Sequence, residues 1–211
     1  MSMADAIGII TVPHALIKSG NKYAYITKRI DRIIDGDNVK KLAMEDFCQL
    51  DFRVTEDKYK GSYERCAKVI DKYSFMPGLD KAELFLRLIF SFVTGNSDMH
   101  LKNFSLIEEK AGNRVYKLSP AYGLLPVNVI MLEDKEELAL PLNGKKTHIR
   151  KKDFFVYGKE CDLSLAAIEK MIQKVISMKQ EYIKMIHESL LPNHLKKRFI
   201  DLIEQRTKAL E

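Results

Sequence analysis

The sequence has few cysteines and no long apolar run, and each shortage excludes a class of protein. Its three cysteines, Cys48, Cys66 and Cys161, are odd in number and show no CxxC spacing. Neither a disulfide framework nor a zinc site is indicated, so we expect a reducing, cytoplasmic environment. The longest apolar stretch, residues 84–94, contains Arg87 and is too short to span a bilayer. The first residues lack the basic and apolar regions of a signal peptide.

No internal repeat, low-complexity segment or linker rich in Pro, Gly or Ser divides the chain. Its 211 residues fit one domain, or one lobe of a larger assembly. The net charge of +6 permits a phosphate-bearing partner but does not require one, because both signs are interspersed. The basic run at residues 145–152 favours a solvated hairpin over a nucleic-acid surface, since aromatic residues within it are sparse. We therefore do not expect direct nucleic-acid binding.

Local patterns predict a short β region followed by a mainly helical chain. The pair Pro77-Gly78 is expected to end one helix and Asp80 to cap the next, which Gly95 then ends. Strands are expected within 7–30 as a hairpin, and at 104–107, 114–118 and 138–142, with a short helix or turn over 42–50. Helices are expected over 62–73 and 81–94, from 164 onward and after Pro192. The predicted class is α+β, mainly α.

The segment after the apolar helix carries most of the functional information. Asp98 is followed five residues later by Asn103, with His100 and Lys102 between them. Phosphoryl transfer needs a carboxylate to orient and deprotonate a hydroxyl and an amide oxygen to hold magnesium, and kinases use this interval. Asp and Asn are also common in turns, so the spacing alone favours a structural turn or cap after the helix. A buried helix directly before the loop favours the functional interpretation, because it provides a rigid support.

Several motifs in the same order resemble the HipA family, the serine/threonine kinase toxins of bacterial toxin–antitoxin modules. The resemblance extends over essentially the whole chain. The motifs that carry it are Tyr25-Ile26-Thr27-Lys28-Arg29-Ile30-Asp31-Arg32, Met44-Glu45-Asp46-Phe47-Cys48-Gln49, Lys58-Tyr59-Lys60-Gly61-Ser62-Tyr63, Gly95-Asn96-Ser97-Asp98-Met99-His100-Leu101-Lys102-Asn103-Phe104-Ser105, Leu118-Ser119-Pro120-Ala121-Tyr122 and Leu138-Ala139-Leu140-Pro141-Leu142-Asn143-Gly144-Lys145.

The resemblance implies a fold, cofactors and a role for each residue in the site. The fold is the C-terminal lobe of a protein-kinase-like architecture, with residues 1–32 as a β-hairpin and hinge remnant and 33–211 as a mainly helical lobe. The implied cofactors are ATP and Mg²⁺. The implied roles are Asp98 as catalytic base, Asn103 as magnesium ligand, His100 and Lys102 beside the phosphates, and Lys28, Arg29 and Ile30 as the hinge that meets adenine.

Two departures from the family pattern bear on activity. The family reads Pro-Ala-Tyr-Asp where this sequence has Pro120-Ala121-Tyr122-Gly123, so the second magnesium-binding carboxylate is missing. Asp134 lies downstream, and we do not expect it to take that place because a large loop rearrangement would be needed. The sequence also opens near Ile7 without the Gly-rich loop and ATP-binding lysine of the family, and no lysine among Lys18, Lys22 and Lys28 has a matching context.

Two hypotheses of different classes follow. In the first, the chain is the C-lobe of a HipA-like kinase, impaired by Gly123 and completed by a separately encoded N-lobe subunit. In the second, it is a catalytically inactive module that binds a HipB-like DNA-binding antitoxin or a separate N-lobe protein. Gly123 favours the second hypothesis for this chain alone, whereas the intact Asp98–Asn103 loop favours the first for its family. The protein substrate is not indicated by the sequence.

Overall fold

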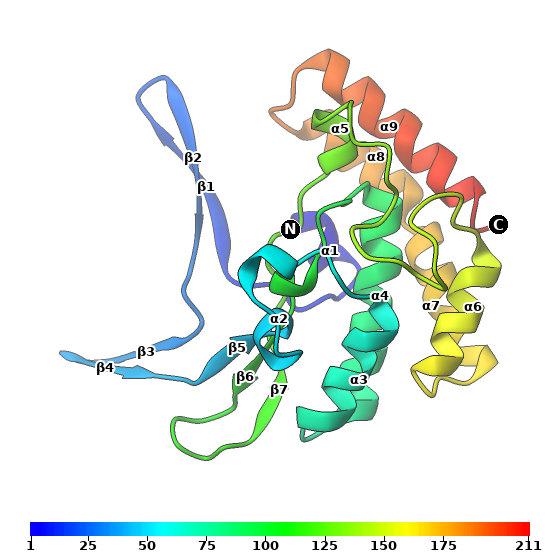
Figure 1. The fold of residues 1–211 in the computed structure, drawn as a ribbon. Coiled ribbons are helices and arrows are strands. Elements are labelled where there is room, and N and C mark those ends of the chain that lie inside the picture. The colour runs from blue at the N-terminus through cyan, green and yellow to red at the C-terminus, as the bar shows by residue number, and fades with distance from the viewer.

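The computed structural model describes all residues from 1 to 211 as nine helices and seven strands. The strands gather at one side of the molecule and the long helices at the other (Figure 1). This is the mainly helical α+β architecture that the sequence predicts. The helices are α1 (Ser2–Ala6), α2 (Phe47–Leu50), α3 (Tyr63–Tyr73), α4 (Pro77–Thr94), α5 (Val127–Ile130), α6 (Lys151–Glu160), α7 (Leu165–Ser177), α8 (Lys179–Glu188) and α9 (Asn193–Lys208). The strands are β1 (His14–Ser19), β2 (Lys22–Thr27), β3 (Arg32–Asp35), β4 (Asn38–Lys41), β5 (Met44–Asp46), β6 (Ser105–Glu108) and β7 (Tyr116–Leu118).

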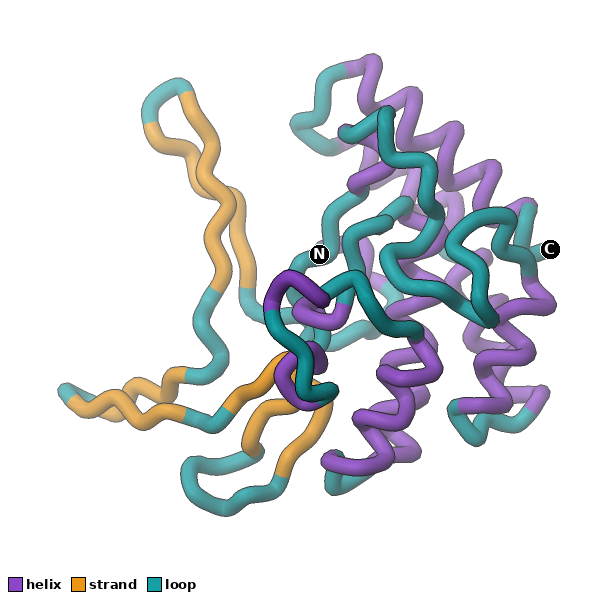
Figure 2. The backbone as a smooth tube through the Cα atoms, viewed as in Figure 1, coloured by secondary structure: helices purple, strands orange, loops and turns teal.

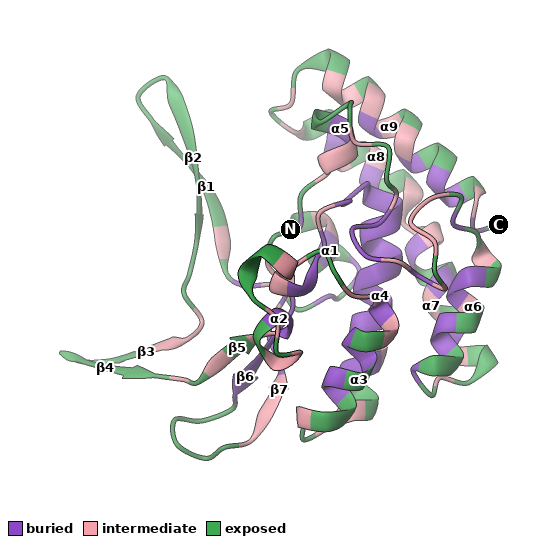
Figure 3. Ribbon diagram, viewed as in Figure 1, coloured by how far each residue is buried: buried purple, intermediate pink, exposed green.

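Helix α4 is the buried support of the helical side. It is buried along most of its length and lies among α3, α7 and α9 (Figure 3). The expected start at Lys81 is wrong, because the helix begins at Pro77, and proline is tolerated in the first turn where its missing N–H has no partner. Asp80 is consequently not a cap. Gly95 ends the helix as predicted, with a left-handed φ of 70° that glycine adopts without strain.

Two antiparallel hairpins, β1–β2 and β3–β4, project from the body of the molecule (Figures 1 and 2). Nearly every residue in them is exposed. The hairpin predicted within residues 7–30 is confirmed, but its first strand starts at His14. Residues 10–12 instead run beside Ala121, whose N–H donates to the carbonyl of Ile10 while its own carbonyl accepts from Val12. The β3–β4 hairpin was not predicted, although Asp35-Gly36 is a turn signal between apolar residues.

The third sheet joins distant parts of the chain in the order β5-β6-β7. The strands predicted near 104–107 and 114–118 are confirmed as β6 and β7, whereas residues 138–142 form no strand. Leu138, Leu140 and Leu142 are nevertheless fully buried, so that apolar run fills the core as irregular chain. No helix combines the length and apolar character needed to cross a membrane.

The basic run at residues 145–152 is largely matched by carboxylates. Lys145 lies 2.5 Å from Asp153, and Lys146 lies 3.1 Å from Glu136. Apart from one bridge between Leu142 and Lys145 the expected hairpin does not form, and α6 begins at Lys151.

Candidate active site

Hydrogen bonds between side chains and backbone groups hold the loop after α4, residues 95–103, in place. The N–H of Asp98 donates to Oδ1 of Asn96 at 3.3 Å, and Nδ2 of Asn103 donates to the carbonyl of Asp98 at 2.5 Å. Nδ2 of Asn96 donates to the carbonyl of Gly123 at 3.2 Å. The loop is therefore held at both ends, with the Asp98 side chain left partly exposed at 43%.

The carboxylate of Asp98 contacts two aromatic residues. Tyr59 donates its phenol hydrogen to Oδ1 of Asp98 at 2.5 Å, and Nε2 of His100 lies 3.9 Å from the same oxygen. Burial lowers the pKa of His100; the charge of Asp98 opposes this and the charge of Lys58 adds to it. The imidazole is therefore neutral at pH 7, and its buried Nδ1 has no hydrogen-bond partner.

Hydrogen bonds from Tyr122 connect a second loop, residues 119–123, to the first loop and the strand that follows it. The hydroxyls of Ser105 and Tyr122 are hydrogen-bonded, and the Tyr122 phenol donates to the carbonyl of Lys102 at 3.2 Å. Burial raises the pKa of Tyr122 to about 12, so it remains a hydrogen-bond donor at neutral pH. Arg87 of α4 supports the second loop from the core by donating to the carbonyl of Ser119 at 2.8 Å.

The predicted hinge meets this pair of loops across a cavity of about 430 Å³. Lys28, Arg29 and Ile30 line it together with Lys102 and Tyr122. The lining also includes Met44, Asp46 and Gln49 from β5 and α2. Nζ of Lys102 lies 2.6 Å from Asp46, and this hydrogen bond raises the pKa of the lysine. The structure thus brings the predicted hinge and Lys102 together, whereas Asp98, His100 and Asn103 do not line this cavity.

The residues around Asn103 fit magnesium only as part of a metal–nucleotide complex. The amide oxygen of Asn103 faces Gly123: a Cβ built on that glycine would lie 3.0 Å from Oδ1. No cluster of three or more His, Cys, Asp or Glu side chains forms a metal cage in the chain. Magnesium in kinase sites takes one or two protein oxygens and completes its shell with phosphates and water. Asn103 provides one such oxygen, and residue 123 provides none.

Asp134 lies beside the Asp98–Asn103 loop, and each of its oxygens accepts a hydrogen bond. One accepts from the hydroxyl of Ser97 at 2.6 Å and the other from the N–H of Glu136 at 3.0 Å. Asn128 joins the same two segments by donating to Ser97. Asp134 therefore helps to hold the loop that carries Asp98.

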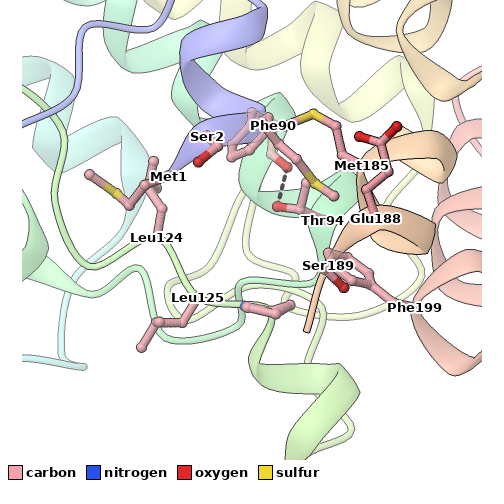
Figure 4. A pocket seen from close by; sticks show the side chains of 12 residues that line it. Met1, Ser2, Phe90, Thr94, Leu124, Leu125, Met185, Glu188, Ser189 and Phe199 are labelled. Carbon is pink, nitrogen blue, oxygen red and sulfur yellow. Dashed lines mark hydrogen bonds between the residues drawn. The ribbon is translucent and has the colours of Figure 1, made fainter. Parts of the chain in front are cut away.

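A second cavity of about 400 Å³ lies behind the Gly123 loop (Figure 4). It is mostly apolar, with Met1, Phe90, Leu124, Met185 and Phe199 among the residues that line it. None of the predicted site residues contributes to it. Of these two cavities, the hinge cavity is the one that offers the polar contacts expected of a nucleotide site.

Three residues of this site were given no role by sequence reasoning. Tyr59 and Asp46 each stand in a motif of the family resemblance, but they meet Asp98 and Lys102 only through folding, across 39 and 56 residues. Arg87 was noted only as an interruption of an apolar helix. A buried arginine within such a helix is a usable signal, because its charge requires partners.

The hinge, the cavity and the paired loops define the class of the protein as the helical lobe of a protein-kinase-like fold. The HipA-like C-terminal domain profile matches residues 1–182, so the chain belongs to that family. The fold is similar to that of HipA from Shewanella oneidensis MR-1, solved with HipB and operator DNA. The TM-score is 0.79 at 18% identity, over 100% of this chain and 56% of that one. It is also similar to the Helicobacter pylori proinflammatory kinase CtkA, with a TM-score of 0.69 at 17% identity, over 99% of this chain and 77% of that one.

Two curated relatives are named as putative kinases. "Putative kinase Y4mE" of Sinorhizobium fredii is 27% identical over 196 residues, covering 89% of this chain and 46% of that protein. A "Putative kinase" of Haemophilus influenzae is 29% identical over 147 residues, covering 62% of this chain and 42% of that protein. The chain thus spans less than half the length of these two relatives.

Proposed function

We propose that the chain is the C-lobe of a HipA-like serine/threonine kinase that acts with ATP and Mg²⁺. The observation that supports this most is that hinge residues 28–30 and Lys102 of the Asp98–Asn103 loop line the same cavity. In this proposal Asp98 accepts the proton of the acceptor hydroxyl, and Asn103 holds Mg²⁺ on the phosphates. Lys102 and neutral His100 lie beside the phosphates, and the backbone at Lys28–Ile30 meets adenine. The metal would neutralise charge on the transferred group.

The same proposal includes an impaired metal site. Glycine at 123 offers no side-chain oxygen, so one anionic ligand of the magnesium–ATP complex is missing. Because catalysis of phosphoryl transfer is mostly positioning and electrostatic stabilisation, this loss lowers the rate by orders of magnitude. A β-rich N-lobe, supplied by a separate subunit or by another part of a longer chain, would provide the remaining phosphate contacts.

Calorimetry with ATP and Mg²⁺ tests the proposal directly. We expect Mg²⁺-dependent binding that Asn103→Ala abolishes, because that change removes the amide oxygen beside residue 123. Asn193→Ala is a matched control, since Asn193 is exposed at the start of α9, away from the site. Binding that is insensitive to Asn103→Ala would contradict the assigned role, and no binding at all would exclude autonomous kinase activity.

A binding module is the second candidate function, and the exposed hairpins favour it. Isolated two-stranded hairpins are marginally stable in water, and exposed apolar clusters mark interaction sites. Eight large apolar side chains are exposed on β1–β4: Leu16, Ile17, Tyr23, Tyr25, Ile26, Ile33, Ile34 and Val39. We infer that these hairpins bind a separate N-lobe protein or a HipB-like antitoxin.

The neighbouring genes separate these two partners. A short frame with a Gly-rich loop and a strand lysine would support a split kinase, and a helix-turn-helix frame alone would support antitoxin binding. Co-purification of the encoded product with this chain, and its loss in Ile34→Lys, would establish the hairpins as the interface. Retention of the complex in Ile34→Lys and in Tyr25→Lys would place the interface elsewhere.

A further inference from the structure

Tyr59 occupies a position that the proposed mechanism does not use. Its phenol oxygen lies 2.5 Å from Oδ1 of Asp98, with the phenol as donor. A general base must approach the hydroxyl that it deprotonates to about 2.6–3.2 Å. The Tyr59 hydroxyl therefore stands where an acceptor hydroxyl would have to stand.

The loop that carries Tyr59 is fastened to the catalytic loop independently of the phenol. The N–H of Leu101 donates to the carbonyl of Lys58 at 3.2 Å. Gly61 packs closely on the same leucine, since a Cβ at that position would lie 3.3 Å from Cδ1 of Leu101. The bond between the Leu101 N–H and the Lys58 carbonyl therefore positions Tyr59 beside Asp98 even without the phenol hydroxyl.

The ring of Tyr59 also has its own packing. It meets the ring of His100 edge to face, with centroids 4.9 Å apart and an interplanar angle of 82°. Nζ of Lys58 lies 5.0 Å from the ring centre of Tyr59. Tyr59 as a whole is nevertheless 43% exposed, so one side of the residue faces solvent.

Asp98 does not need Tyr59 to hold its place. Its N–H and carbonyl are already bonded to Asn96 and Asn103. The hydrogen bond from Tyr59 to Oδ1 of Asp98 is therefore not needed to position Asp98, and its main effect is to occupy that oxygen.

We propose that Tyr59 is an internal occupant of the acceptor position, and that the hydroxyl of a protein substrate must displace the Tyr59 phenol from Asp98 before transfer. The proposal rests on the function proposed above, in which Asp98 is the base. In this position the phenol also keeps water from Oδ1 of Asp98 while no protein acceptor is bound. The phenol remains protonated in this position, because burial, the hydrogen bond to Asp98 and the charges of Asp98, Asp134 and Glu136 raise the pKa of Tyr59 to about 12.

The first test measures the contact and requires no activity. Tyrosine ¹³Cζ resonances are followed against pH in the unmodified chain, and Tyr59 is assigned by its loss in Tyr59→Phe. We expect Tyr59 to titrate near 12, and to move toward the ordinary value of about 10 in Asp98→Asn. An ordinary titration in the unmodified chain would overturn the proposal.

The second test measures ATP hydrolysis in Gly123→Asp with and without Tyr59→Phe. In hydrolysis a water oxygen bonds to the γ-phosphorus, the bond to ADP breaks, and Asp98 takes the water proton. Removing the phenol opens the base to water, so we expect hydrolysis to rise roughly 10-fold, within the range that general-base catalysis contributes. The KM for ATP should not change, because Tyr59 does not line the hinge cavity.

The outcomes separate this proposal from the proposed function. Slower hydrolysis in Tyr59→Phe would mean that Tyr59 positions the base, and would overturn its role as an occupant. Tyr73→Phe, at the end of α3, is the control and should leave hydrolysis unchanged. Failure of Gly123→Asp to bind Mg²⁺–ATP would overturn the proposed function itself, and the acceptor role with it.

Discussion

A Cβ atom on Gly123 would lie 3.0 Å from Oδ1 of Asn103, so a side chain at position 123 points at the amide oxygen of the predicted magnesium ligand. This places the missing family carboxylate beside the remaining ligand. The φ of 67° at Gly123 is left-handed, and aspartate tolerates that region better than most residues.

Gly123→Asp should therefore strengthen Mg²⁺-dependent ATP binding. We expect a gain of roughly tenfold in affinity, equivalent to about 1.4 kcal/mol, because the new carboxylate adds an anionic ligand. Calorimetry with Mg²⁺–ATP measures this gain. Gly123→Asn is the matched control, since it has a similar size and the same backbone strain without the charge. Equal affinities for the two variants would show that a carboxylate at 123 does not reach the metal.

The Asp46–Lys102 pair should restrain ATP binding. Asp46 holds Nζ of Lys102 at 2.6 Å on the wall of the hinge cavity, and its own charge repels a triphosphate. Asp46→Asn should tighten ATP binding in the Gly123→Asp background, because it frees the lysine and removes the repulsion. Asparagine caps helices as well as aspartate does, so α2 should keep its cap. Weaker binding in Asp46→Asn would instead indicate that Asp46 helps to hold the metal.

Arg87 holds the second loop through the carbonyl of Ser119, and its buried guanidinium is paired with Glu83. Arg87 is 2% exposed, and burial lowers its pKa while the charge of Glu83 opposes the shift. Glu83→Ala leaves this charge unpaired, so we expect the free energy of unfolding to fall by about 3 kcal/mol in urea titrations. Adding Arg87→Met should recover part of that loss.

The control for this prediction is a surface ion pair. Glu169→Ala breaks the exposed contact with Lys151 and should lower the free energy of unfolding far less, because solvent screens an exposed ion pair. If Glu83→Ala costs no more than Glu169→Ala, the charge of Arg87 does not depend on Glu83.

The sequence predicted the elements whose signals are local. Ser62 caps α3 and Gly95 ends α4 because a side-chain acceptor and a left-handed residue act within one turn of the chain. Pro77 misled the prediction for the same local reason, since proline is compatible both with the end of one helix and with the first turn of the next. The run at 138–142 was predicted as a strand, but no neighbouring strand is available to pair with it.

The residues of the candidate site also divide into those with a local sequence signal and those brought together only by folding. The Asp98–Asn103 interval was predicted from its spacing, and the hinge residues were assigned by resemblance to the family, because both signals lie in short runs of sequence. The contacts of Asp98 with Tyr59 and of Lys102 with Asp46 join residues 39 and 56 positions apart. Asp80 also has a long-range partner: it is buried and accepts a hydrogen bond from the N–H of Leu118. No local sequence pattern at Asp80 predicts that bond. Such pairings depend on how the loops are folded against α4.

His100 should make the stability of the chain fall as the pH falls below about 6.5. Burial lowers the pKa of the folded imidazole from 6.5, the charges of Lys58 and Lys102 act in the same direction, and Asp98 opposes them. Below pH 6.5 the unfolded chain therefore binds the proton more readily than the folded chain, which favours unfolding by at most about 1.4 kcal/mol per pH unit. Urea titrations between pH 7.5 and about 5 measure the slope, which should be shallower in His100→Gln. His194→Gln, at an exposed position, should retain the original slope. If His100→Gln and the unmodified chain lose stability in parallel, His100 does not bind its proton more weakly in the folded state.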